Sequence, residues 1–519
     1  MALQTETDGA ICSSFRLPVP YSDTKTTVRP TARLSLAGLP LRLWHSPTIT
    51  TWGSFAARTL SLVAVFPLVL ARFSAEQVVV WSLLNSIIGL QMLADLGFAS
   101  TFSRVIAFAM GGAKDLVDFR NPKRVHGSGE PDWEVIGRIS STMGTVYGRL
   151  TVVSVIALAS FGTWSLNKPI EALPDRTEAW LAWAVVLATT AITFRGNAYS
   201  AYLQGINQIA LLRRWEIATS VGAVITSTAV MLVDGSLLAL VVANQIWLVI
   251  ATLRNRWLCS VVKQGRFFYG SDQGLDGPIF QAVWPSAWRS GVGIALTGGL
   301  VQVSNLLYAQ WGPVQQVASY LIALRLIQAV SQFSQAPFYS KTPLLARLRS
   351  EGKLDEQVYV ARRGMLLSYW AYSIGFVAIG TSAGPLLKLL DSQTSFVEPQ
   401  LWALMGLVFF CERYGAMHLQ LYTTTNHIIW HTVALVHSAI FMAVSLATFN
   451  FVGAYAIPGG LLAGYLGFYS WYSAAHSYKA FHLQLWSFEK STSLVPLSVT
   501  LVYSLGSFLF PMLSKTWNG

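Results

Sequence analysis

The chain has 519 residues, of which 53% are hydrophobic and only 12% are charged. Soluble proteins carry roughly 25% charged residues, so this composition excludes an ordinary water-facing surface. The net charge is +12, but the basic residues lie between apolar blocks and not along one stripe, which argues against nucleic-acid binding. The three cysteines, Cys12, Cys259 and Cys411, are scattered and offer neither a disulfide framework nor a metal-ligand spacing.

Apolar blocks dominate the chain after a polar beginning. Residues 1–50 are rich in Thr, Ser and Pro and contain no apolar core of the signal-peptide type, so we expect a flexible cytoplasmic tail there. Each later block is about 20 residues long, enough to cross a hydrocarbon core of roughly 30 Å as a helix. The thirteen predicted spans cover residues 52–71, 77–98, 140–163, 180–203, 215–233, 236–257, 284–308, 315–338, 366–388, 399–421, 429–450, 453–474 and 494–513.

Lys and Arg residues orient these spans, because cytoplasmic loops of membrane proteins retain positive charge. With the N-terminus inside, the inner segments hold 25 Lys and Arg residues and the outer segments hold five. The two longest connections, 103–139 and 339–365, both fall on the inner side. The second has a helical spacing that suits either a helix on the membrane surface or a simple connecting helix. The sequence thus predicts a multi-pass membrane protein.

The two long inner connections also indicate an internal duplication. Residues 51–258 and 284–475 share one layout, in which a hairpin, a long basic connection and two further hairpins follow each other. Both halves begin on the inner side, so we predict an all-α fold of two six-helix bundles related by a pseudo-two-fold axis along the membrane normal. A cytoplasmic linker is expected at 259–283, and a cytoplasmic segment with an extra helix at 476–519.

Arginines inside the apolar blocks are the candidate substrate-binding residues. An arginine at the centre of a membrane helix costs on the order of 2.5–3.5 kcal/mol on insertion scales, so such residues tend to face a wet cavity or a partner. Guanidinium groups can donate two parallel hydrogen bonds to a phosphate. We therefore predict one cationic cavity that binds an anionic substrate. The arginines are Arg58, Arg149, Arg195, Arg289, Arg325 and Arg413.

Some of these arginines have another interpretation. Arg58 and Arg289 lie near the inner ends of their spans and could extend to the interface. Arg195 and Arg413 could brace neighbouring helices. Arg149 and Arg325 lie nearest to the middle of the membrane, which favours the cavity for these two.

Two acidic residues are candidates for ion coupling or charge balance. Asp95 lies at the inner end of the second span, where we expect it to pair with Arg58 or Arg104 in a structural role. Glu412 adjoins Arg413, but successive helical residues point about 100° apart, so we do not expect these two to face one partner together. Glu412 then either binds a coupling cation or proton, or neutralises an arginine from another helix.

A family resemblance begins in the second span. The stretch Trp81 to Ala109 (WSLLNSIIGLQMLADLGFASTFSRVIAFA), preceded by a span that contains Arg58 and Pro67-Leu68, resembles the opening hairpin of bacterial polysaccharide flippases. These are the O-antigen-type members of the multidrug/oligosaccharidyl-lipid/polysaccharide (MOP) exporter superfamily. The segment Thr342 to Lys353 (TPLLARLRSEGK) is similar to the basic connection after their eighth helix.

The resemblance covers roughly residues 50–475 and implies both a fold and a function. The fold is two six-helix bundles in the bacterial inner membrane. The function is to move undecaprenyl-diphosphate-linked oligosaccharide from the inner to the outer leaflet, in association with polysaccharide assembly proteins. The long N-terminal tail and the extra span at 494–513 depart from the family pattern, and an odd number of spans would place the C-terminus outside.

Three other functions compete with this one. A polytopic O-antigen polymerase or glycosyltransferase would use the same lipid carrier, but it would normally carry a large exterior loop, and the longest one predicted here has about 16 residues. A multidrug antiporter of the same superfamily should have an acidic cavity. A membrane scaffold would leave the arginines unexplained. The sequence contains no phosphate-binding glycine loop, nucleophile triad or metal cluster, so we predict no catalysis, no cofactor and no metal.

Overall fold

The computed structural model describes residues 60–93, 95, 97–111, 130–233, 235–268, 274–350, 352–425, 427 and 429–517. Within these ranges every regular element is a helix. Eight of the helices described are long and apolar enough to cross a membrane, and shorter apolar helices cover Leu60–Arg72, Ala75–Leu90, Phe98–Met110 and Leu494–Leu509. The protein is therefore an all-α, multi-pass membrane protein, as the sequence predicts.

The helices of the N-terminal bundle are interrupted at three points by non-α turns or a kink. Its elements are α3 (Phe66–Arg72), α4 (Ala75–Leu93), α5 (Phe98–Met110), α7 (Trp133–Ala157), the π-helix η3 (Leu158–Gly162), α8 (Thr163–Glu171), α9 (Arg176–Thr193), the 3₁₀ turn η4 (Phe194–Gly196), α10 (Asn197–Gly205), α11 (Ile209–Val233), α12 (Leu237–Val261) and η5 (Val262–Phe268).

The C-terminal bundle follows the same order and then adds two helices. Its elements are α13 (Gly277–Ile294), the π-helix η7 (Ala295–Gly299), α14 (Leu300–Trp311), α15 (Val314–Ser334), α16 (Ala336–Tyr339), α17 (Thr342–Ser350), α18 (Leu354–Leu389), α19 (Pro399–Thr423), α20 (Trp430–Val452), η8 (Gly453–Tyr455), α21 (Ala456–Gly464), the π-helix η9 (Tyr465–Tyr469), α22 (Ser470–Phe481), α23 (Leu485–Lys490) and α24 (Leu494–Trp517).

Capping side chains fix the starts of four long helices. Asp132, Asp175, Ser236 and Asp276 each accept a hydrogen bond, 3.0 to 3.1 Å long, from the backbone N–H three residues further on. Such a side chain satisfies one of the free N–H groups at a helix N-terminus. The sequence thus determines where α7, α9, α12 and α13 begin.

The predicted spans coincide with helices wherever the structure describes them, with one correction. The expected inner connection 103–139 begins with most of α5, which continues the second span after a kink at Gly97, where φ is +70°. This segment is helical because Phe98, Phe102 and Ile106 are buried in the core of the N-terminal bundle. The basic residues of this connection led the sequence analysis to assign it as a loop, although it has an apolar face.

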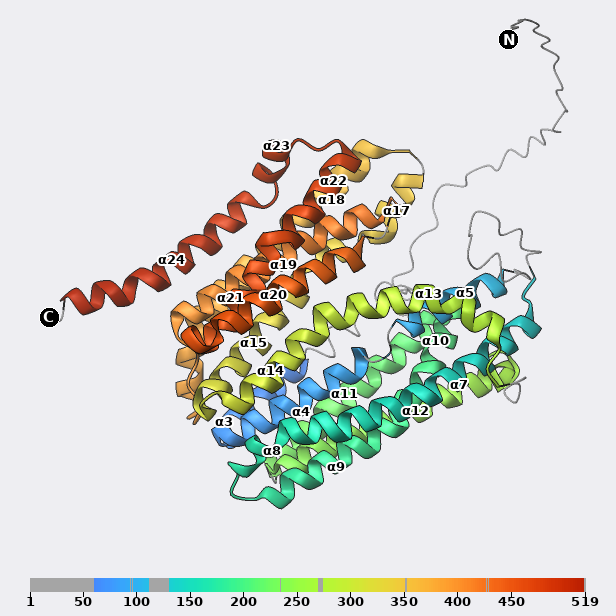
Figure 1. Cartoon of the computed structure of the whole chain (residues 1–519), viewed down its shortest axis with the longest axis horizontal. Helices are drawn as coiled ribbons and strands as arrows, with labels where there is room; N and C mark the ends of the chain where they lie inside the picture. The colour runs from blue at the N-terminus through green and yellow to red at the C-terminus, as the bar shows by residue number, and fades with distance from the viewer. Residues whose placement is uncertain are drawn as a thin grey trace, which may run out of the picture. The chain divides into compact units, whose positions relative to one another are not determined.

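The two bundles lie side by side, with α13 and α14 between them (Figure 1). The first part of α13 packs against α5, and the ring centroids of Phe98 and Trp284 lie 6.0 Å apart. Beyond the π-helix η7, α14 packs against α4 and α8 of the N-terminal bundle and against α15 of the C-terminal bundle. One continuous helical span therefore runs along the interface between the bundles.

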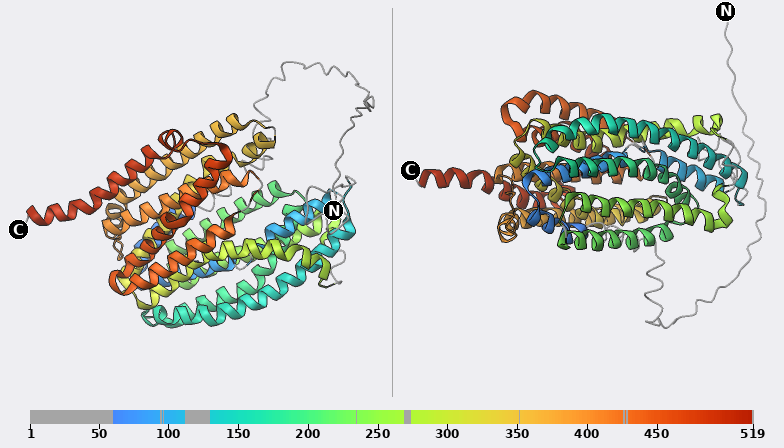
Figure 2. Two further views of the ribbon diagram at one scale, coloured as in Figure 1. Left: turned by 45° about the horizontal axis from the view of Figure 1, so that its top comes forward. Right: turned by 90° about the horizontal axis from the view of Figure 1, so that it is seen from below.

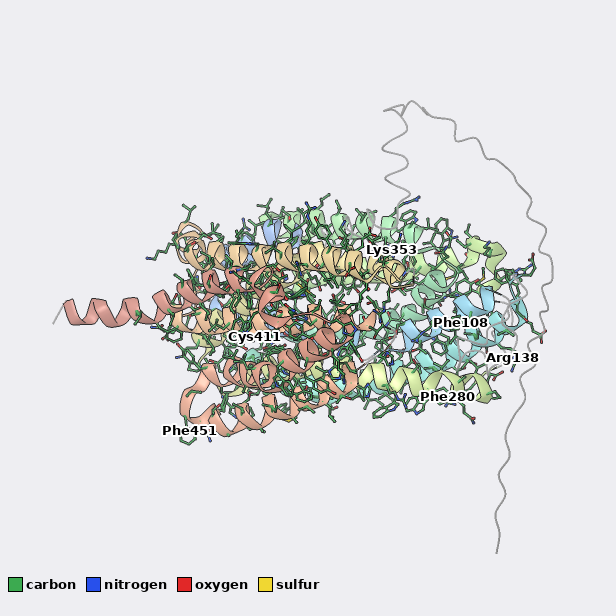
Figure 3. The ribbon with its side chains drawn as sticks, turned by 90° about the horizontal axis from the view of Figure 1, so that it is seen from above. Phe108, Arg138, Phe280, Lys353, Cys411 and Phe451 are labelled. Atoms are coloured by element: carbon green, nitrogen blue, oxygen red, sulfur yellow. The ribbon has the colours of Figure 1, made fainter. Side chains whose placement is uncertain are left out.

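Two residues that the sequence assigns to opposite sides of the membrane lie at opposite ends of the molecule. Figure 3 shows Arg138, which belongs to a predicted inner segment, and Phe451, which belongs to a predicted outer link, at opposite ends of the molecule. The extra helix α24 packs on α18 and α19, where the Ser373 Oγ donates to the Pro496 carbonyl at 2.9 Å. Its far end extends past the neighbouring helices (Figure 2).

Candidate functional site: a polar cavity between the bundles

A cavity of about 490 Å³ lies between Ser61, Leu62 and α4 of one bundle and α14–α15 of the other. This volume is within the range of small-molecule binding sites. The polar residues that line it are Ser61, Ser82, Asn85, Ser86, Gln302, Asn305, Arg325, Gln328, Gln332 and Gln335. No carboxylate is among the residues that line it in the described part of the chain.

Arg325 supplies the positive charge of this cavity. Its guanidinium carbon lies 4.3 Å from the ring centroid of Trp81 and 5.5 Å from that of Phe66. Cation–π contacts of this kind contribute about 0.5–2 kcal/mol, depending on how far the cation is desolvated. These contacts hold the guanidinium group in place without using its N–H donors. No described residue forms a hydrogen bond or an ion pair with these N–H groups. The charge of Arg325 is positioned but not neutralised.

Neutral amide and hydroxyl groups make up most of the remaining polar surface. Gln328, Gln332 and Gln335 follow Arg325 at helical spacing, so all four lie along one face of α15. Across the cavity, Asn305 is 2% exposed and its Oδ1 has no hydrogen-bond partner in the described part of the chain. Amides provide both donors and acceptors, so this surface can bind hydroxyl groups next to an anion.

Hydrogen bonds between the two bundles close the cavity at the end predicted to be outside. The Lys168 ammonium group of α8 donates to the backbone carbonyl of Gln310 in α14. The Gln310 Nε2 in turn donates to the backbone carbonyl of Ser165. These reciprocal bonds tie α8 to α14, so the structure represents a state closed on that side.

Arg413 does not line the cavity but contacts its edge. It is 4% exposed, and its Nη1 donates to the Oε1 of Gln335 at 3.3 Å. Its Nη2 lies 3.2 Å from the Oε2 of Glu412 and donates to the hydroxyl of Ser331. Arg413 is thus held in an ion pair behind α15, and Gln335 links this ion pair to the cavity.

The expectation for Glu412 needs correction. Glu412 neutralises its own neighbour Arg413 and not an arginine from another helix. Both side chains also contact one partner, since the Ser331 hydroxyl donates to Glu412 at 3.1 Å and accepts from Arg413. The backbone directions diverge by about 100°, but both side chains are long enough to curve back toward α15.

Asp95 has a structural partner that the sequence did not indicate. Its carboxylate accepts hydrogen bonds from the Tyr147 hydroxyl and from the backbone N–H of Ala99, the latter at 2.9 Å. It therefore caps the start of α5 and ties the kink to α7. Arg104, one of its two expected partners, instead donates to the hydroxyl of Ser286 at 3.3 Å. The other expected partner, Arg58, lies outside the described residues.

The structure does not bring the described members of the predicted arginine set into one cavity, and Arg58 lies outside the described residues. Arg195 lines a separate pocket of about 610 Å³ between α7, η4–α10 and α12. Arg149 and Arg289 are exposed and line neither pocket. Of the described members of the set, Arg325 alone lines the cavity between the bundles. Among the described residues, no group of three or more His, Cys, Asp or Glu side chains is placed to hold a metal ion.

The glutamines are the cavity residues that the sequence analysis missed. Gln328, Gln332 and Gln335 repeat every three or four residues after Arg325 within an apolar block. This periodicity indicates a polar stripe on a helix face. A search for periodic amides, in addition to charges, would have found it.

No protein-family model and no curated protein matches the sequence. Solved structures do match it. An inward-facing multidrug resistance MATE family transporter of the MOP superfamily is 13% identical, with a TM-score of 0.59 over 83% of this chain and 96% of that chain. The MATE multidrug transporter DinF-BH is 15% identical, with a TM-score of 0.57 over 88% of this chain and all of that chain.

A flippase structure is similar to the same extent. The lipid II flippase MurJ in an inward closed conformation is 11% identical, with a TM-score of 0.56 over 91% of this chain and 93% of that chain. At sequence identities this low, the similarity shows a shared fold and not a shared substrate. The two-bundle architecture nevertheless extends over nearly the whole of each neighbour, and the chain therefore has the fold of the MOP exporter superfamily.

Proposed function

We propose that the protein is a membrane transporter that moves an anionic, lipid-linked oligosaccharide, carried on undecaprenyl diphosphate, from the inner to the outer leaflet of a bacterial inner membrane. The observation that carries this proposal is the unneutralised Arg325 guanidinium, set among amides and hydroxyls at the interface between the bundles. The shared fold supports transport, and one neighbour with that fold is named as a flippase of a lipid-linked substrate.

The lining fits such a substrate chemically. The planar guanidinium of Arg325 can donate two parallel hydrogen bonds to phosphate oxygens. The amides of Gln302, Gln328 and Gln332 can bind sugar hydroxyls on either side. The lipid tail would stay in the membrane, since only the head group is polar enough to need the cavity.

Transport would proceed by alternating access. In the present state the contacts of Lys168 and Gln310 close the end predicted to be outside. To release the substrate there, α8 and α14 must separate while the opposite side closes. The π-helix η7 divides the span at the interface into α13 and α14, and such segments often mark functional sites in helices.

A multidrug antiporter is the main competing function, because two of the similar structures are described as multidrug transporters. An organic cation would be bound by a carboxylate or by an open aromatic face. No carboxylate lines the described part of the cavity, and the Trp81 ring is already covered by Arg325. The cavity chemistry therefore favours an anion over a cation.

A reconstituted transport assay separates the two functions. Proteoliposomes that contain the full chain would be given a fluorescent lipid-linked diphosphate oligosaccharide in one set and a cationic dye in another. We expect translocation of the anionic lipid and none of the dye. Dye transport without movement of the anionic lipid would overturn the proposal.

Variants of Arg325 connect the activity to the cavity. Charge-assisted hydrogen bonds contribute about 1.5–3 kcal/mol, so Arg325→Ala should raise the half-saturating lipid concentration at least about tenfold. Arg325→Lys keeps the charge but loses the bidentate geometry. Its half-saturating lipid concentration should therefore lie between those of the wild type and Arg325→Ala. Lys388→Ala, an exposed cation at the far end of α18, is the matched control. Equal transport by all four proteins would exclude Arg325 from the site.

A further inference from the structure

A second pocket lies in the N-terminal bundle, away from the other bundle. It has a volume of about 610 Å³, and its walls come from α7, from η4–α10 and from α12. In Figure 1 these helices run along the edge of the molecule opposite to α18–α22, and the left view of Figure 2 places them in the same way. The pocket is therefore separate from the cavity between the bundles.

Two arginines supply the charge of this pocket. Arg195 and Arg256 both line it, both are exposed, and neither forms a hydrogen bond or an ion pair with a described residue. Ser140, which is 3% exposed, also lines it, and its Oγ has no hydrogen-bond partner in the described part of the chain. No acidic residue is among the lining residues. Two guanidinium groups and a free hydroxyl form a donor set suited to a phosphate.

Glycines keep the pocket open. A Cβ atom added at Gly144 of α7 would meet nothing within 4 Å, and one added at Gly148 would lie 4.0 Å from the Nη2 of Arg195. These two residues are one helical turn apart, so they leave a flat strip on α7 beside the guanidinium group. On the opposite wall, a Cβ at Gly196 would lie 2.7 Å from the Cγ2 of Thr252, which shows how closely η4 and α12 approach each other.

An apolar, exposed surface adjoins the cationic pocket. Ile192 and Leu253 line the pocket and are 47% and 54% exposed. Leu253 and Arg256 also line a neighbouring hollow of about 420 Å³ together with Trp257, which is 53% exposed. A soluble phosphate would need no such surface, whereas an acyl chain would lie on it. Tryptophan is also the residue enriched at the level of lipid head groups.

The position along the helices agrees with a lipid head group. Ser140 lies seven residues after the start of α7, and Arg256 lies five residues before the end of α12. At about 1.5 Å per residue, both are roughly 7–11 Å inside the helix ends on the side predicted to be cytoplasmic. We propose that this pocket binds the phosphate of an anionic phospholipid of the cytoplasmic leaflet, with Arg195 and Arg256 as its ligands and with an acyl chain along Leu253 and Trp257.

The experiment measures lipid binding to the purified full chain by native mass spectrometry. Short-chain phosphatidylglycerol and phosphatidylcholine would be titrated separately, and inorganic phosphate would be added as a soluble competitor. Both lipids carry the phosphate, but phosphatidylcholine also carries a trimethylammonium cation that the two guanidinium groups repel, and a like-charge contact of this kind changes affinity by about tenfold or more. We therefore expect phosphatidylglycerol to bind at least about tenfold more tightly than phosphatidylcholine, and inorganic phosphate not to displace it at matching concentrations.

Two independent variants locate the binding. Arg195→Gln with Arg256→Gln removes both charges, and Gly144→Leu fills the pocket while both charges remain. Each should reduce phosphatidylglycerol binding to the level of phosphatidylcholine, with the thermal unfolding midpoint retained. Lys479→Gln, which removes an exposed charge from the inner end of α22, should leave binding within about twofold of the wild type.

Three outcomes would overturn the proposal. The first is equal binding of both lipids by the wild type. The second is displacement by inorganic phosphate at the concentrations at which phosphatidylglycerol itself binds, which would assign the pocket to a soluble phosphate. The third is full binding by Gly144→Leu, because the arginines would then act outside the pocket.

Discussion

Lys168→Met removes the ammonium group that ties α8 to α14. In the structure this group donates to the Gln310 carbonyl, and a hydrogen bond that involves a charged group contributes about 1.5–3 kcal/mol. Because Lys168 is exposed, we take the lower end of this range, about 1.5 kcal/mol, which corresponds to a change of about tenfold in an equilibrium constant. The bond exists only while the outer side is closed, so the variant should raise the ratio of outward-open to closed molecules about tenfold.

Distance measurements between two spin labels test this value. Labels at Ala172, just after α8, and at Gln316, in the first turn of α15, report on the gap between the bundles at that end. We expect a longer-distance population that grows about tenfold relative to the short one. Arg176→Met, an exposed cation at the same end with no hydrogen bond to a described residue, is the control. Identical distance distributions for the two variants would refute the role of the Lys168 contact.

Three further predictions concern packing and charge. Gly406→Ala would place a Cβ atom 2.2 Å from the Cε2 of Phe376. Since overpacking costs about 1–3 kcal/mol, the thermal unfolding midpoint in detergent should fall. An unchanged midpoint would contradict the observed contact. Arg138→Ala breaks the ion pair with Asp276, in which the Nη2 and Oδ2 atoms lie 2.6 Å apart. Because this pair is partly exposed, the loss of stability should stay below about 1 kcal/mol. It should show mainly as faster proteolysis of the connection between α12 and α13. Burial alone would raise the pKa of Glu489, but the contact with the His418 Nε2 at 3.3 Å and the hydrogen bonds from Ser493 and Tyr478 outweigh it and lower the pKa below 4.5. The charge therefore stabilises the fold above pH 4.5, and the stabilisation is lost as the pH falls through the lowered pKa. Relative to Glu489→Gln, the wild type should therefore lose its stability advantage in acid, and a constant difference from pH 7 to pH 3 would argue against the network.

The helices could be predicted from the sequence because the bilayer imposes a strict length. A span of about 20 apolar residues is the shortest helix that crosses the hydrocarbon core, and backbone groups in lipid must be paired within the segment. The starts of α9 and α12 follow from this requirement together with the caps formed by Asp175 and Ser236. The helix α5 could not be assigned in this way, because its burial depends on contacts with α10 and α13, which are far away in sequence.

The candidate site was only partly predictable. The cost of a charge in the membrane identifies which arginines need an explanation, but not which bundle face each one occupies. Arg325 and Arg195 lie on different sides of the N-terminal bundle because α15 packs on α4 whereas η4 packs on α7 and α12. An amide side chain costs less free energy to insert into a membrane than a charged one does. The cost of insertion therefore did not identify the glutamines of α15 as candidate site residues.

Under the proposed function, a cavity whose described lining contains a single unneutralised cation also explains why binding need not prevent release. Six free arginines on one diphosphate would each add a charge-assisted bond, and substrate held so tightly could not leave at the outer side. Arg325 belongs to α15 of one bundle, but it lies against Trp81 and Phe66 of the other. A phosphate that draws the guanidinium group away from these rings removes a contact between the bundles worth about 0.5–2 kcal/mol. Substrate binding and separation of the bundles would then be coupled through the same side chain.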